Sequence, residues 1–169
     1  MPELTCVIAD DEPLALELLQ SLVEAREDIE IVGICQDGRQ ALAAIRATGP
    51  DLLFLDIEMP HYSGFEIVKR LQPEPMPAVI FTTAFNRYAI EAFEIHAVDY
   101  VLKPLNAERL GLAIERAKIR LKSEKIHRDD RKADVLHAIG RISAKETREI
   151  DPDISPADDE VKPTDSKTL

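Results

Sequence analysis

The sequence lacks the features that mark several classes of protein. Its 169 residues include only two cysteines, which do not form a CxxC pair, so we expect buried, reduced thiols at Cys6 and Cys35. The run 76–86, within the longest uncharged stretch, is far shorter than the ~20 apolar residues that span a bilayer. The N-terminus has no basic segment followed by an apolar one, as a signal peptide would have. These absences predict a cytoplasmic protein without a membrane partner.

The chain also has fewer basic than acidic residues. The chain has 32 Asp and Glu residues against 21 Lys and Arg residues, which gives a formal net charge of −11. This balance argues against the broad cationic surface of generic nucleic-acid binding proteins, so DNA binding by this chain is not expected. With 45% hydrophobic residues the chain has enough apolar side chains for a core, and its length suits one domain of ordinary size.

Five short apolar runs alternate with stretches of helical character. Hydrophobicity within most of these runs is nearly continuous, which is typical of strands covered on both faces of a parallel sheet. The expected strands are 4–9, 30–35, 51–55, 78–82 and 100–102, and the expected helices are 14–26, 40–48, 65–71, 88–95 and 107–121. This (βα)₅ pattern predicts an α/β fold, a flavodoxin-like doubly wound parallel sheet with strand order 2-1-3-4-5.

Two helical segments carry apolar residues that we assign to the core. The first helix has them at the i, i+4 spacing of a buried stripe, made of Leu14, Leu18, Leu19, Leu22 and Val23. We also expect Phe85, Tyr88 and Phe93 to pack the fourth helical segment against the sheet. Any of these three aromatic residues that is exposed becomes a candidate for an interface.

The character of the chain changes after residue 122. We predict one domain over 1–122, a charged extension over 123–148, and a disordered tail over 149–169, which is acidic and contains three prolines. In the extension, Val135, Leu136, Ile139 and Ile142 have helical spacing, which is compatible with a continuation of the last helix or with a short separate helix.

Acidic residues follow two of the expected strands. Asp10-Asp11-Glu12 ends the first strand, and Asp56-Ile57-Glu58-Met59-Pro60 ends the third. In the predicted strand order these two ends are neighbours at the point where ligands of such sheets bind. Any single acid there is readily explained as a solvated side chain, but several together repel one another unless a cation or protons neutralise them. Oxygen ligands alone favour a hard ion such as Mg²⁺.

The remaining strand ends add a hydroxyl and an ammonium group. The fourth strand ends in Thr82-Thr83-Ala84 and the fifth in Lys103-Pro104. A carboxylate nucleophile, a divalent cation, a hydroxyl and an ammonium around one point suit the binding of a phosphoryl group, because they balance the charge on its oxygens.

These motifs, taken in order, resemble the receiver domain of two-component response regulators. The resemblance covers residues 4–121 and includes Gly64 after the second acidic motif. It implies that Asp56 accepts a phosphoryl group from a sensor histidine kinase or a histidine phosphotransfer protein. It also implies that Asp11 and Asp56 bind Mg²⁺ directly, that Asp10 contributes through water, and that Glu58 contributes its backbone carbonyl.

The resemblance further assigns Lys103 to the phosphoryl oxygens and makes Thr83 and Tyr100 a switch pair. In the family, the pair reshapes the face made by the last two helices and the last strand, here 88–95, 100–102 and 107–121. This face is therefore the expected output and a candidate homodimer interface. We expect Asp56 to be ionised at neutral pH, held so by Mg²⁺ and Lys103, and to need no general base. The protein is then a phospho-accepting signalling domain and not an enzyme acting on a separate substrate.

The segment 83–104 is similar to receivers of the LytTR class, which usually precede a β-rich DNA-binding domain. Only 47 residues follow residue 122, too few for that domain. Two interpretations stay open: a regulator that signals through protein contacts, or the receiver portion of a DNA-binding transcriptional regulator. A phosphatase of the haloacid dehalogenase type is disfavoured, because its Asp-x-Asp-x-Thr run follows its first strand, whereas Asp56 follows the third.

Overall fold

The computed structural model describes residues 2–71 and 76–149, and five of its segments form one parallel sheet. The strands are β1 (Leu4–Ala9), β2 (Ile29–Cys35), β3 (Leu52–Asp56), β4 (Ala78–Thr83) and β5 (Asp99–Leu102). Their order is β2-β1-β3-β4-β5, and all neighbours are parallel. The predicted fold class and strand order are confirmed. The strand order reverses between β1 and β3, and the two acidic motifs follow these strands.

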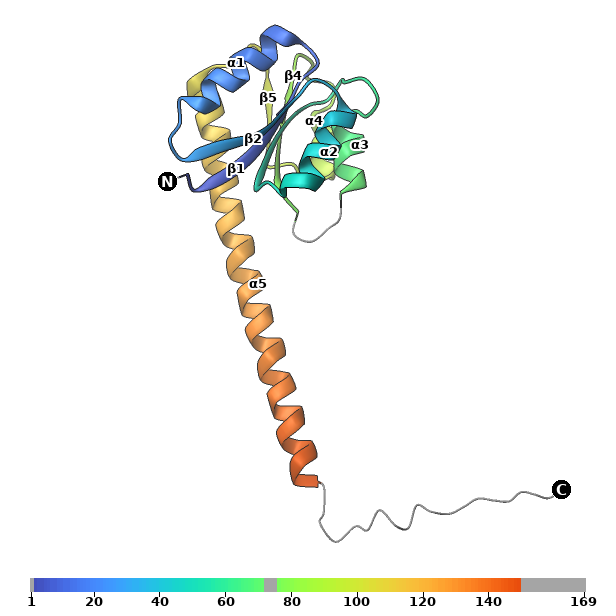
Figure 1. The fold of residues 1–169 in the computed structure, drawn as a ribbon, viewed down its shortest axis with the longest axis vertical. Helices are drawn as coiled ribbons and strands as arrows, with labels where there is room; N and C mark the ends of the chain where they lie inside the picture. Colours follow the sequence, from blue (N-terminus) through green and yellow to red (C-terminus); the bar gives the residue numbers. More distant parts are fainter. Residues whose placement is uncertain (1, 72–75, 150–169) are drawn as a thin grey trace, which may run out of the picture. The chain divides into compact units, whose positions relative to one another are not determined.

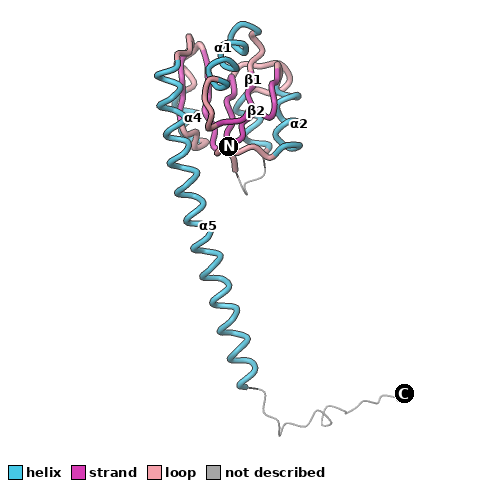
Figure 2. Tube along the Cα trace, turned by 60° about the vertical axis from the view of Figure 1, so that its left-hand side comes forward, coloured by secondary structure: helices cyan, strands magenta, loops and turns pink. Residues whose placement is uncertain are grey.

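Five helices cover the two faces of the sheet. They are α1 (Pro13–Glu24), α2 (Gly38–Thr48), α3 (Gly64–Arg70), α4 (Ala89–Glu94) and α5 (Ala107–Glu149). Helices α1 and α5 lie on one face, and α2, α3 and α4 lie on the other (Figure 1). Figure 2 shows the strands side by side between these helices. Because both faces are covered, all five residues of β3 are buried.

Local sequence determines where the helices begin. The Asp37 side chain accepts a hydrogen bond from the Gln40 amide at the start of α2. Ser63 forms a capping box with Glu66 at the start of α3. Each cap satisfies amide groups that the first turn of a helix leaves free, so the loops that follow β2 and β3 end at defined residues.

The predicted packing of α1 is wrong in part. Leu19 and Val23 are buried as expected, but the side chains of Leu14 and Leu18 are 76% and 40% exposed. Helix α1 is apolar around more of its circumference than the sheet covers, and Leu16 lies on the buried face instead. The assignment of Phe85 and Phe93 to the core is also wrong: they are 39% and 65% exposed. Phe85 lies in the loop before α4, and only Ala92 of this short helix is buried.

The chain divides into two units, Met1–Glu124 and Lys125–Leu169. Helix α5 continues to Glu149, so the extension is a continuation of the last helix and not a separate one. Among the residues of α5 up to 142, for which burial is described, the buried stripe consists of Leu110, Ala113, Ile114 and Ala117, all in the first unit. The predicted disorder over 149–169 falls, from residue 150 on, outside the described residues.

The structure also bears on the expectations for the two cysteines and for membrane spans. Cys6 and Cys35 are buried free thiols, as expected. Across residues 2–71 and 76–149, each helix is too short or too polar to cross a bilayer.

Candidate functional site

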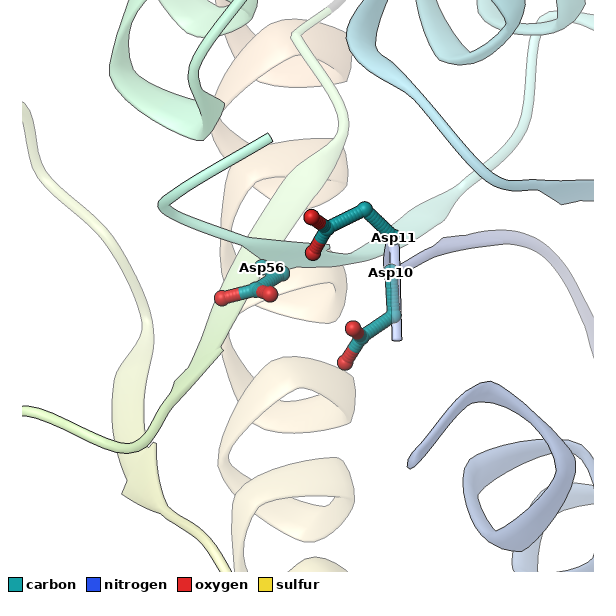
Figure 3. A group of neighbouring side chains, drawn as sticks. All are labelled: Asp10, Asp11 and Asp56. Atoms are coloured by element: carbon teal, nitrogen blue, oxygen red, sulfur yellow. The ribbon is translucent and has the colours of Figure 1, made fainter. Parts of the chain in front are cut away.

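The sheet brings the two acidic motifs together. Ala9 of β1 pairs with Leu55 of β3, so the residues that follow them, Asp10 and Asp56, are immediate neighbours. The carboxyl groups of Asp10, Asp11 and Asp56 each offer an oxygen within 4.8 Å of the others. Figure 3 shows these groups gathered beside the end of β3. The convergence expected from the sequence is therefore present.

Lys103 supplies the positive charge in this cluster. Its Nζ lies 2.7 Å from Oδ2 of Asp10 and 3.3 Å from Oδ2 of Asp56. A third carboxylate, from Glu12, is 3.6 Å away. Burial alone would lower the pKa of Lys103, but the contacts with Asp10 and Asp56 raise it above its ordinary value. The ammonium group therefore stays charged and bridges the acids of β1 and β3.

One ammonium group does not neutralise the cluster. Burial and the neighbouring charge of Asp10 raise the pKa of Asp56 to about 7, although Lys103 acts in the opposite direction. Lys103 lowers the pKa of Asp56, as expected from its charge, but without Mg²⁺ it does not offset the effects of burial and Asp10. The reason is that the Asp56 side chain is 8% exposed and that it faces a like charge as well as a cation. The expectation that Mg²⁺ and Lys103 together keep Asp56 ionised stays a prediction.

The two predicted switch residues both bind the backbone of Phe85. The Thr83 hydroxyl oxygen accepts a hydrogen bond from the Phe85 amide at 3.2 Å. The Tyr100 hydroxyl donates to the Phe85 carbonyl. Thr83 and Tyr100 thus hold the loop between β4 and α4 through the amide and the carbonyl of one residue. The neighbouring Thr82 is buried, and its hydroxyl has no partner in the part of the chain that the structure describes.

Two glycines let helices approach the loop that carries Glu58. A Cβ on Gly64 would lie 2.6 Å from the backbone oxygen of Asp56, and a Cβ on Gly38 would lie 2.0 Å from that of Tyr62. The Gly38 amide donates to the Pro60 carbonyl at 3.1 Å. Any side chain at either position would displace this loop, because real Cβ atoms do not come so close to backbone atoms.

Arg87 and Tyr88 are at the site, although the sequence analysis did not assign them to it. Nη2 of Arg87 lies 2.7 Å from Oε1 of Glu58, and the Tyr88 hydroxyl donates to the same carboxyl group. Tyr88 also borders a cavity of about 490 Å³ together with Asp11 and Glu58. The only signal in the sequence was the position of both residues a few places after Thr83, which does not by itself indicate a contact with Glu58.

The donor set fits a magnesium ion. Ligands of an octahedral Mg²⁺ site lie ~2.1 Å from the ion, and therefore ~3.0 to ~4.2 Å from one another. The carboxylate oxygens of Asp10, Asp11 and Asp56 are within 4.8 Å, so small side-chain rotations bring them into that range. All donors are oxygens, the class that Mg²⁺ prefers.

Comparison with known proteins points to one family. A family model described as "Response regulator receiver domain" matches residues 6–115. The chain is 47% identical over 123 residues to the transcriptional regulatory protein BtsR of Escherichia coli strain K12, covering 73% of this chain and 50% of BtsR. It is 52% identical over 110 residues to BtsR of Salmonella typhi, covering 65% and 46%. The chain thus spans about half the length of the curated relatives it matches.

Solved structures give the same result. The response regulatory domain of mrkE from Klebsiella pneumoniae matches with a TM-score of 0.65 and 31% identity, over 70% of this chain and 98% of that one. The REC domain of AraT from Geobacillus stearothermophilus matches with a TM-score of 0.64 and 28% identity, over 73% and 98%. The chain therefore belongs to the response regulator receiver domain family and carries the receiver domain of a two-component response regulator.

Proposed function

We propose that Asp56 accepts a phosphoryl group in a Mg²⁺-dependent reaction and that the domain switches a protein-interaction face in response. The observation that carries this proposal is the convergence of Asp10, Asp11 and Asp56 with Lys103 at one end of the sheet. The experiment that tests it is phosphoryl uptake from a small acyl phosphate by the wild-type and Asp56→Asn proteins, with and without Mg²⁺.

The carboxylate of Asp56 attacks the phosphorus of a phosphohistidine on the partner. The P–N bond breaks as the new P–O bond forms, and the imidazole leaves with the electron pair and takes up a proton. Mg²⁺, when bound by Asp11, Asp56, a water on Asp10 and the Glu58 carbonyl, supplies charge stabilisation for the phosphoryl oxygens. Lys103 moves from its bridge between carboxylates to those oxygens, since the negative charge is now located on them.

Thr83 and Tyr100 convert this change into a new surface. A phosphoryl oxygen attracts the Thr83 hydroxyl, which at present accepts from the Phe85 amide. Moving Thr83 releases one of the two bonds that hold Phe85, while Tyr100 holds the other. The adjacent face of α4, β5 and α5 exposes apolar side chains that suit a protein partner or a homodimer. The exposed apolar residues of these three elements include Ile90, Phe93, Leu102, Leu112 and Ile119.

A histidine kinase is the expected source of the phosphoryl group, because receiver domains of response regulators interact with these kinases. The exposed Leu14 and Leu18 side chains of α1 support this partner. They line a second cavity, of about 380 Å³, with Lys103 at its wall. A helix of the kinase that packs against α1 would therefore place its phosphohistidine close to Lys103 and Asp56.

A second candidate is the receiver portion of a LytTR-type DNA-binding regulator. It is favoured by the match to BtsR, a transcriptional regulatory protein of which the chain covers about half the length. In this case DNA binding belongs to a part of the protein outside this chain. The phosphoryl chemistry and the switching face are the same in both candidates.

Mg²⁺ alone is expected to stabilise the domain. At about ten times its Kd, mass action adds about 1.4 kcal/mol to the free energy of unfolding, or roughly 4 °C in melting temperature. Asp11→Ala should remove most of this rise, because Asp11 is a proposed direct ligand of the ion. The variant should still fold, because Asp11 is exposed and its loss costs little packing. Thermal melts with and without Mg²⁺ measure the effect. An undiminished rise in Asp11→Ala would place the ion elsewhere.

The fragment 1–122 is expected to fold and to take up phosphoryl groups at the rate of the full chain. All proposed site residues precede residue 104, and the buried stripe of α5 ends at Ala117. Self-association should instead fall in the fragment, because it lacks the exposed apolar residues Val135, Leu136, Ile139 and Ile142. Analytical ultracentrifugation compares the two proteins. An unfolded or inactive fragment would disprove the domain boundary, and equal association would disprove a dimer role for the extension.

A further inference from the structure

The side chain of Glu58 is held by two residues of the loop before α4. Arg87 Nη2 lies 2.7 Å from Glu58 Oε1, and the Tyr88 hydroxyl donates to the same oxygen. We call these three residues the Glu58 clasp. The guanidinium of Arg87 also stacks over the rings of Phe85 and Tyr88, at 4.4 and 4.9 Å from their centroids. The clasp is therefore a defined arrangement of contacts and not a single exposed ion pair.

The clasp acts on a residue whose backbone belongs to the proposed metal site. Glu58 is two residues after Asp56, and its side chain is 47% exposed. An exposed side chain in a loop ordinarily leaves its own peptide group free to rotate. Here Arg87 and Tyr88 hold the carboxyl group, so rotations of the Glu58 backbone that would pull this group away from both partners are disfavoured. Glu58, Tyr88 and the metal-site residue Asp11 line the same cavity.

The loop that supplies Arg87 and Tyr88 is itself anchored. Phe85 is bound at its amide by Thr83 and at its carbonyl by Tyr100. The ring of Tyr88 packs edge-on against Phe65 of α3, with 5.9 Å between centroids. Because the loop has these independent anchors, the clasp restrains Glu58 more than Glu58 restrains the loop.

We propose that Arg87 and Tyr88 are positioning residues for the metal site: they hold the Glu58 side chain so that its backbone carbonyl is preorganised to bind Mg²⁺. The inference rests on the proposed Mg²⁺ site and adds residues to it. Loss of a partner that orients a metal ligand without touching the metal commonly weakens metal binding by about 10- to 100-fold.

Electrostatics and a positioning role predict opposite changes in Mg²⁺ affinity for the Arg87→Ala protein. Arg87→Ala removes a positive charge near an acidic cluster, so electrostatics alone would tighten the binding of a cation. A positioning role predicts the opposite, weaker binding. Tyr88→Phe changes no charge and keeps the ring, and it removes only the hydroxyl that reaches Glu58.

The experiment is isothermal titration calorimetry with MgCl₂ on the wild-type, Arg87→Ala, Tyr88→Phe and Arg39→Ala proteins. We expect the Kd for Mg²⁺ to rise about tenfold in Arg87→Ala and in Tyr88→Phe. Arg39 is the matched control: it is exposed and approaches the same loop at His61, 3.4 Å away, without being part of the Glu58 clasp. Arg39→Ala should bind Mg²⁺ as tightly as the wild type or slightly more tightly.

Binding as tight as the wild type in either Arg87→Ala or Tyr88→Phe overturns the proposal, and so does an equal loss in Arg39→Ala. The Asp11→Ala protein separates this outcome from a failure of the metal site. If Asp11→Ala binds Mg²⁺ like the wild type, the proposed site itself is wrong. If Asp11→Ala loses Mg²⁺ while the two clasp variants keep it, only the positioning role is wrong.

Discussion

The Asp56→Asn protein is expected to take up no phosphoryl group from a small acyl phosphate, whereas the wild type gains one in the presence of Mg²⁺. An amide is not a nucleophile toward phosphorus, because its nitrogen lone pair is delocalised into the carbonyl. The fold should persist, since Asn has nearly the size of Asp and the residues around it in β3 are all buried apolar side chains. Intact-protein mass spectrometry measures the gain.

Glu12→Gln is the control for this substitution. Glu12 lies 3.6 Å from Lys103 in the same cluster, but its side chain is 62% exposed and we assign it no covalent role. Its variant should take up phosphoryl groups like the wild type and lose them on treatment with hydroxylamine, which cleaves acyl phosphates. A hydroxylamine-sensitive phosphoryl group on Asp56→Asn would disprove the assignment of the acceptor.

The fold and the core of the site could be predicted because they depend on order along the chain. Each strand reads as a nearly unbroken apolar run, since both of its faces are covered. Once β1 and β3 are neighbours, the residues after Ala9 and Leu55 must meet at one edge of the sheet. Neither step requires knowledge of side-chain conformation.

The features that sequence reasoning missed depend on how much of each element is covered and on contacts between loops. Leu14 and Leu18 have the spacing of a core stripe, but the sheet and α5 cover only the face of α1 that carries Leu16. Arg87 meets Glu58 because two loops, 29 residues apart in sequence, lie against each other. No local pattern encodes such a contact.

The raised pKa of Asp56 is another feature that the sequence alone could not predict. Its ordinary pKa of ~3.9 follows from its residue type, but the raised value follows from its burial beside Asp10. The metal-free domain therefore carries an acceptor that is partly protonated at neutral pH. Binding of a cation to the cluster favours the ionised form, which links the nucleophile to the presence of the ion.

The contribution of Asp56 to the stability of the metal-free protein is expected to depend on pH. Because the pKa of Asp56 is raised to about 7 by folding, the native state keeps a proton between pH ~4 and pH ~7 that the unfolded chain releases. The contribution of Asp56 to the free energy of unfolding must then fall as the pH rises through this window. Asp56→Asn removes this penalty, so its melting temperature should exceed that of the wild type by about 5 °C or more at pH 8, and by much less at pH 5.

Asp28 and Asp99, whose pKa values are lowered by their arginine and lysine partners, titrate below this window and are present in both proteins. Thermal melts at several pH values in a chelating buffer measure the difference, and added Mg²⁺ should reduce it, because the cation stabilises the Asp56 carboxylate. A difference that stays constant from pH 5 to pH 8 would show that Asp56 titrates as an ordinary carboxyl group.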